Sequence, residues 1–200
     1  MAVSTKPSSE RCLGLLEINS VPLGCIVVDA MLKGATLQLL LSRPVTPGKY
    51  LVLVEGDVQS VRSGLDAGIV EAGTGLIGEL FLPQPHPHLI EGIVAPRSVE
   101  ATDALVVLQT TDVASALAAA DGALKTGAVD LIELRLAMGL GGQAFFTLVG
   151  EVSSVEVALE KGALLAGNAL LESRLIANPD PALLSEICQP QAPFSDLYGH

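Results

Sequence analysis

Apolar and polar residues follow one order along the first half of the chain and repeat it along the second half. Residues 12–93 recur as residues 104–187. The offset between the copies is 92 residues up to Lys33 and 94 residues from Gly56 onward, so the second copy has two extra residues. These two residues are inserted between Arg135 and Gly150. An insertion at one point, between segments that otherwise align, marks a loop. We expect the function of the protein to lie at this loop, which differs between the copies.

Each copy predicts four strands and three helices. Short apolar runs are typical of buried strands, and they fall at 12–19, 37–43, 50–55 and 76–82, then at 104–110, 129–135, 144–149 and 169–176. Apolar residues at helical spacing follow the first and third strand of each copy, and short proline-opened helices are expected at 87–93 and 181–187. Polar pairs, at 19–20 and 111–112, precede the first helix of each copy as N-caps.

The order strand, helix, strand, strand, helix, strand, helix predicts an α+β fold, in which helices pack against an antiparallel four-stranded sheet. The duplication predicts two such domains in tandem. The expected boundaries are an N-terminal extension at 1–11, a first domain at 12–94, a linker at 95–103, a second domain at 104–188 and a tail at 189–200.

Composition adds a hint about assembly. Hydrophobic residues make up 50% of the chain and charged residues 16%, while aromatic residues reach only 3%. Such a surplus of small aliphatic side chains is more than two small domains need inside. It favours large permanent subunit contacts, which resemble a core cut in half. An Ala- and Leu-rich genome bias would produce the same composition.

Charge, hydropathy and cysteine content argue against several classes of protein. A net charge of -11 argues against nucleic-acid binding, which needs basic patches. The longest uncharged run is shorter than a membrane span, and the polar start lacks the apolar core of a signal peptide. The three cysteines form neither a disulfide framework nor a CxxC site, which fits a reducing cytosol.

Particular motifs carry a family resemblance. The run Asp29-Ala-Met-Leu-Lys33, the strand–loop–strand at 39–54, Gly56-Asp57-Val58 and the later Pro-x-Pro element resemble a bacterial microcompartment (BMC) shell domain. Two such domains in one chain resemble the tandem-domain shell proteins, notably those of propanediol utilisation. The resemblance implies a homotrimer shaped as a pseudohexamer, located in the microcompartment shell in the cytoplasm. It also implies edge contacts with hexameric and pentameric shell proteins, and no catalysis.

The resemblance also assigns residues to the edge of the tile. A lysine near the end of the first helix lies at the edge in hexameric relatives, and Lys33 and Lys125 occupy that position here. As an alternative, each lysine is a solvated charge that complements the helix dipole. The family places an arginine in the later proline-rich element, whereas Gln84 and Asn178 stand here, which removes a multi-donor cation from the lateral contact.

The resemblance places the loop after the second strand of each domain at the symmetry axis. Small residues and glycine suit a loop crowded by its symmetry copies. The predicted pore-lining residues are Val45, Thr46, Pro47, Gly48, Met138, Gly139, Leu140 and Gly141. Threonine hydroxyls give a polar, uncharged lining, which favours passive passage of small polar metabolites.

Two other functions stay open on the sequence. In propanediol-utilisation relatives the first loop carries a cysteine that binds an iron–sulfur cluster in the pore, but Thr46 supplies no thiolate here. We therefore expect no cofactor. A trimeric small-ligand-binding protein is the other alternative. No carboxylate pairs with a candidate nucleophile, so no catalytic residue is expected.

His86 and His88 are expected as exposed loop residues, Cys12 and Cys25 as buried thiols, and Cys188 as an exposed one.

Overall fold

The computed structural model describes residues 11–94, 97, 99, 101–137 and 139–188. The first unit contains β1 (Cys12–Ile18), α1 (Val21–Gly34), β2 (Gln38–Val45), β3 (Lys49–Gly56), α2 (Val58–Ala72), β4 (Leu76–Pro83) and α3 (Pro87–Val94). The second unit contains β5 (Ala104–Thr110), α4 (Val113–Thr126), β6 (Asp130–Leu136), β7 (Ala144–Gly150), α5 (Val152–Ala166), β8 (Leu170–Ala177) and α6 (Pro181–Ile187). Single 3-10 turns, Gly73–Gly75 and Gly167–Ala169, precede β4 and β8.

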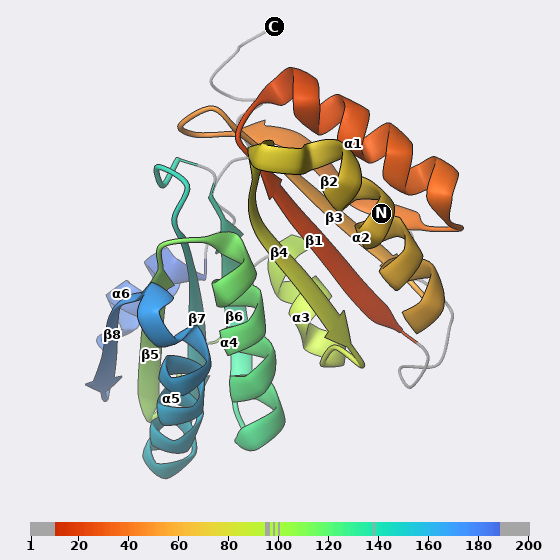
Figure 1. Cartoon of the computed structure of the whole chain (residues 1–200). Helices are drawn as coiled ribbons and strands as arrows, with labels where there is room; N and C mark the ends of the chain where they lie inside the picture. The colour runs from red at the N-terminus through yellow and green to blue at the C-terminus, as the bar shows by residue number, and fades with distance from the viewer. Residues whose placement is uncertain (1–10, 95–96, 98, 100, 138, 189–200) are drawn as a thin grey trace, which may run out of the picture.

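Each unit forms a four-stranded antiparallel sheet with the same topology. The strand orders are β2-β3-β1-β4 and β6-β7-β5-β8, so the first strand of each unit lies inside its sheet. The α+β fold and the tandem arrangement predicted from the repeat are confirmed (Figure 1). Helices α1 and α2 pack together over the first sheet, and α4 and α5 pack together over the second.

Strand β1 is buried on both faces, which explains its continuous apolar run. Successive side chains of a strand point to opposite faces. Leu16 and Ile18 belong to the core under α1 and α2, while Leu13 and Leu15 belong to a larger core that extends into the second unit. The first sheet is therefore packed against its own helices on one side and contributes to a core shared by both units on the other.

The two units contact each other through specific elements. Strand β4 and strand β1 of the first unit approach α4, and helix α3 packs against β6 and α4. Figure 1 shows α3 on the side of the first sheet that faces the second unit. We call this contact of β1, β4 and α3 with α4 and β6 the internal interface.

The predicted N-caps divide into two kinds. Ser20 occupies the N-cap of α1, but its side chain makes no capping hydrogen bond. Asp112 caps α4 by accepting a hydrogen bond from the Ser115 backbone N–H. A carboxylate with this geometry satisfies one of the free N–H groups of the first turn and also favours the positive end of the helix dipole.

Two expectations about cysteines were wrong. Cys25 is exposed on α1, and Cys188, at the C-terminal cap of α6, is buried, whereas Cys12 is buried as expected. Helical spacing placed Cys25 on an apolar stripe, but within a single chain that stripe faces outward.

Among the described helices, none has the length and apolar character of a membrane span. Residues 1–10 of the predicted extension, the tail and part of the linker lie outside the described residues.

Candidate functional site

The loop between β2 and β3 is a tight turn with an exposed tip. Thr46, Pro47 and Gly48 are exposed, and the Gly48 backbone N–H donates to the Val45 carbonyl over 2.9 Å. Gly48 has a φ of 115°, a conformation that favours glycine. Val45 ends β2 with only 6% of its side chain exposed, and it belongs to the shared core. The exposed part of this predicted pore loop is therefore 46–48.

The loop between β6 and β7 is longer and richer in glycine. Gly139 and Gly141 are exposed and have φ values of 73° and 62°. The Leu140 backbone N–H donates to the carbonyl of Ala137 over 3.3 Å, and the Gln143 backbone N–H donates to the carbonyl of Leu140 over 3.1 Å. These contacts fold the insertion into two successive turns. Met138, also predicted to line the pore, lies outside the described residues.

The two loops lie side by side, on one side of the molecule (Figure 1). Gly142 of the second loop has a φ of 88°, and a Cβ added there would lie 3.2 Å from Lys49 Nζ and 3.4 Å from Pro47 Cδ. A side chain at this position would meet both strain and crowding. The internal interface thus brings together the two segments that the sequence predicted as pore loops.

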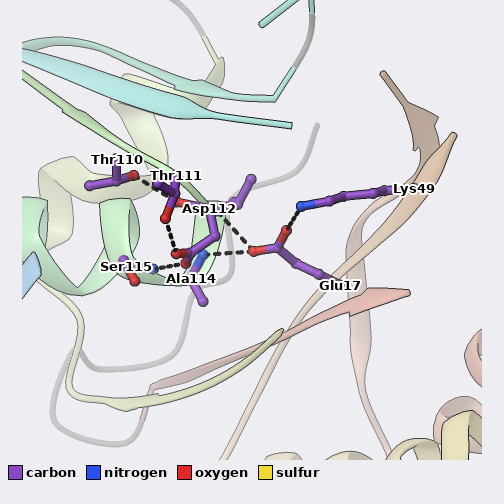
Figure 2. Close-up of polar contacts among 8 residues, drawn as sticks. Glu17, Lys49, Thr110, Thr111, Asp112, Ala114 and Ser115 are labelled. Carbon is purple, nitrogen blue, oxygen red and sulfur yellow. Dashed lines mark hydrogen bonds and ion pairs between the residues drawn. The ribbon is translucent and has the colours of Figure 1, made fainter. Parts of the chain in front are cut away.

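Glu17 joins the units immediately beside these loops. Its carboxylate oxygen Oε1 accepts hydrogen bonds from the backbone N–H groups of Val113, over 2.8 Å, and Ala114, over 3.0 Å. Its other oxygen lies 3.5 Å from Lys49 Nζ. Figure 2 shows the Glu17 side chain between Lys49 and the start of α4. A negative charge at the beginning of a helix is favoured by the free N–H groups and the dipole there.

Burial dominates the titration of Glu17. The side chain is fully buried, and this burial raises the pKa of Glu17 above its ordinary value of 4.5. The Ala114 N–H, the Lys49 ammonium and the Val113 N–H pull the pKa in the other direction, while the Asp112 carboxylate raises it. Glu17 therefore sits where removal from water outweighs its hydrogen bonds.

Threonine hydroxyls hold the first turn of α4 beneath Glu17. Thr110 Oγ1 donates to the Asp112 carbonyl over 2.7 Å, and Thr111 Oγ1 donates to Asp112 Oδ2 over 3.1 Å. Asp112 Oδ1 accepts from the Ser115 backbone N–H over 2.8 Å (Figure 2). The start of α4 is thus fixed by its own unit through Asp112 and by the other unit through Glu17.

A second polar contact crosses the internal interface further along α4. The His86 backbone N–H donates to Asp121 Oδ1 over 2.7 Å, and Lys125 Nζ donates to Asp121 Oδ2 over 2.5 Å. Partial burial lowers the pKa of His86. The His86 ring stacks edge-on with His88, and both rings are half-buried, unlike the exposed residues predicted. Among the described residues, no group of three or more His, Cys, Asp or Glu side chains is placed to hold a metal ion.

The second unit carries an uncharged version of the Glu17 contact. Glu17 corresponds to Gln109, and Lys49 corresponds to Gln143, by the offsets of the repeat. Gln109 Nε2 donates to Gln143 Oε1 over 2.7 Å. An ion pair in one unit is therefore an amide pair in the other.

The predicted edge residues lie at matching places in the two units. Lys33 Nζ lies 2.5 Å from Asp29 Oδ2 one turn earlier, as Lys125 does from Asp121, and the side chains of the lysines are 76% and 42% exposed. Gln84 and Asn178 are exposed and follow β4 and β8 with φ values of 52° and 47°.

Sequence reasoning missed Glu17 and Gln109. A signal was present, because each is a polar residue inside an apolar strand, and a buried carboxylate needs hydrogen-bond partners. The partner of Glu17 lies in the other unit, so spacing along the chain did not reveal it.

Comparison with known proteins agrees with the architecture. The BMC domain family model matches residues 12–85 and again residues 104–179. The chain is 35% identical to the bacterial microcompartment shell protein PduT of Citrobacter freundii over 157 residues, which cover 78% of this chain and 85% of PduT. It is 33% identical to the bacterial microcompartment shell protein EutK of Salmonella typhimurium over 121 residues, covering 58% of this chain and 74% of EutK.

A solved structure gives the same answer. The crystal structure of a microcompartments protein from Desulfitobacterium hafniense DCB is 41% identical, superposes with a TM-score of 0.80 and covers 87% of this chain and 98% of its own. The duplicated fold, the two family matches and these relatives agree with the resemblance carried by the motifs. The chain belongs to the BMC domain family, as a tandem-domain shell protein of a bacterial microcompartment.

Proposed function

We propose that three copies of this chain close into a pseudohexameric plate with a central pore. The observation that carries this proposal is the contact of the two loops, in which Gly142 lies against Lys49 and Pro47. If the relation between the two units is repeated between copies, the loops of all units gather around one axis. Closed cyclic symmetry is the usual way in which such surfaces are satisfied.

The proposed pore is polar and carries little charge at its rim. Thr46, Gly48, Gly139 and Gly141 present hydroxyl and backbone groups at the exposed loop tips. The Lys49 ammonium beside them faces the Glu17 carboxylate, which offsets its charge. A lining of this kind admits small polar metabolites through hydrogen bonding and size. Passage is passive, and the plate holds no cofactor and performs no catalytic step.

At its edges the plate meets other shell proteins, hexameric and pentameric. Lys33 and Lys125 are exposed at matching positions, and Gln84 and Asn178 are exposed at the turns after β4 and β8. Because Gln84 and Asn178 stand where the family has arginine, neither of these two positions supplies a guanidinium to a neighbouring carbonyl or carboxylate. The lateral contacts therefore select partners through the lysines.

Sedimentation of the purified protein tests the plate. We expect a trimer and, by electron microscopy, flat sheets or closed shells when other shell proteins are present. A chain that stays monomeric at micromolar concentration would contradict the proposal.

A colourless protein is expected, and the visible absorption of an iron–sulfur cluster would contradict the assignment of a cofactor-free pore.

Flux through assembled shells tests the pore. Thr46→Asp places carboxylates around the axis and is expected to reduce the entry of an anionic metabolite several-fold, because like charges repel in a narrow channel. Thr46→Asn is the control, since it has nearly the same size as aspartate without its charge. Equal permeability of the two variants to anions would exclude Thr46 from the conducting path.

A further inference from the structure

Helices α1 and α4 have the same place in their units but very different exposure. Val113 and Leu124 of α4 are 0% and 4% exposed, whereas their counterparts on α1, Val21 and Leu32, are 38% and 40% exposed. Leu117 is buried, while its counterpart Cys25 is exposed. The difference follows from the internal interface, because β1, β4 and α3 of the first unit pack against α4. Among the described residues, α1 packs mainly against α2, β1 and β3 of its own unit.

We infer that a second copy of this chain covers the face of α1 formed by Val21, Cys25 and Leu32, and that its Gln109 takes there the place that Glu17 takes on α4. We call this the subunit interface. It continues the geometry of the internal interface, and the inference rests on the proposed trimer. The occupant is a second copy because the strand that carries Gln109 corresponds to the strand that already covers α4.

The chemistry of the two helix starts supports this pairing. At the internal interface one carboxylate oxygen accepts two backbone N–H groups, those of Val113 and Ala114. Their counterparts on α1 are Val21 and Pro22. Proline has no backbone N–H, so the α1 position offers one donor in place of two. Its N-cap residue also supplies no side-chain cap.

The acceptor differs to match this loss of a donor, because Gln109 stands in the second unit where the first unit has Glu17. An amide has a single carbonyl oxygen and carries no charge, and Gln109 already uses its Nε2 group toward Gln143. The Oε1 atom of Gln109 remains as the acceptor for one donor, the Val21 backbone N–H of the next copy. At the internal interface, the Glu17 carboxylate faces two N–H donors and Lys49. At the subunit interface, the Gln109 amide faces one N–H donor and Gln143.

Reversing these substitutions one at a time tests the inference. Gln109→Glu buries a carboxylate opposite one donor and without a lysine, so we expect the dissociation constant of the trimer to rise by at least about tenfold. Pro22→Ala alone is expected to change it by less than about twofold. The triple variant Gln109→Glu, Gln143→Lys, Pro22→Ala reproduces the internal interface and is expected to restore the wild-type constant, as measured by sedimentation.

Thiol labelling gives an independent readout. Cys12 and Cys188 are buried, and burial raises the pKa of the Cys12 thiol to about 11, which slows its reaction. Cys25 is therefore the thiol that reports on the face of α1. We expect a maleimide to label Cys25 at least about tenfold more slowly in the trimer than in dissociated chains obtained by dilution.

The outcomes separate the inference from the proposed function. A monomeric wild-type protein would contradict the trimer itself. A wild-type trimer in which Cys25 reacts freely, or in which Gln109→Glu assembles as tightly as wild type, would overturn the subunit interface alone. If Gln109→Glu does not fold, the triple variant decides, because a folded but monomeric triple variant also overturns the inference.

Discussion

The Glu17 carboxylate accepts a hydrogen bond from the Val113 backbone N–H, 96 residues further along the chain, over 2.8 Å. This contact makes the start of a helix in one unit depend on a side chain of the other. The two sheets therefore do not fold as unrelated domains joined by a linker. They share an apolar core as well as this buried acceptor.

Removal of the Glu17 carboxylate is expected to destabilise the whole chain. Glu17→Ala leaves the buried N–H groups of Val113 and Ala114 without an acceptor, at a cost of about 2–4 kcal/mol in the free energy of unfolding. Chemical denaturation followed by circular dichroism measures this change. Glu71→Ala, at an exposed position of α2, is the control and should change the unfolding free energy by less than about 0.5 kcal/mol. Equal effects of both variants would show that Glu17 does not couple the units.

The contribution of Glu17 depends on pH. Its pKa in the folded protein is raised above 4.5, so the folded chain binds this proton more tightly than the unfolded chain. Its stabilising contribution is complete below the unfolded pKa and is lost as pH rises through the folded pKa. We expect the unfolding free energy of the wild type, relative to Glu17→Gln, to fall as pH rises above 4.5. Denaturation of both proteins across this range measures it, and a difference that grows with pH would contradict the burial argument.

The N-caps of α1 and α4 predict different losses of stability when each is replaced by alanine. Asp112→Ala removes the acceptor of the Ser115 N–H and is expected to lower the unfolding free energy by about 1 kcal/mol. Ser20→Ala is the matched control in the other unit, because the Ser20 side chain makes no capping bond. Thermal unfolding of the two variants compares them. A Ser20→Ala variant as unstable as Asp112→Ala would show that Ser20 caps α1 in solution.

The two units fill the space beneath their first helix with side chains of different size. The first unit has Gly24 and Tyr50, and the second has Ala116 and Ala144 at the corresponding positions. A Cβ added to Gly24 would lie 2.3 Å from Tyr50 Cγ. Gly24→Ala is therefore expected to overpack this site and to lower the unfolding free energy by about 1–3 kcal/mol.

A compensating change tests whether Gly24 and Tyr50 act as a pair. The double variant Gly24→Ala, Tyr50→Ala reproduces the residues of the second unit, and we expect the penalty of Gly24→Ala to be smaller in the Tyr50→Ala background. A double-mutant cycle by chemical denaturation measures the coupling. Additive effects would contradict a direct steric contact.

The order of helices and strands could be predicted because each element carries its own pattern. The apolar run of β1 and the proline that opens α6 define those elements locally. The glycine-rich insertion after β6 also signalled a turn, and the loop there has glycines with positive φ. The duplication then gave the tandem architecture, since two equal patterns fold into two equal sheets.

Exposure could not be predicted in the same way. Cys25 and Leu117 have the same place in the same helical stripe, yet one is exposed and the other buried. The pattern states that a face is apolar but not which surface covers it. Val45 likewise looked like part of a loop, and its side chain lies in the shared core.

The amino-acid sequence by itself determined the two copies, the α+β units and the resemblance to shell proteins, because the repeat, the element patterns and the motifs are visible in the order of residues without knowledge of which residues meet in space. Only the tertiary structure decided that Glu17 caps α4, that Gly142 lies against Lys49, and that Gln109 and Gln143 form an amide pair. Such contacts join residues far apart along the chain, and their partners are fixed by how one sheet packs against the next unit.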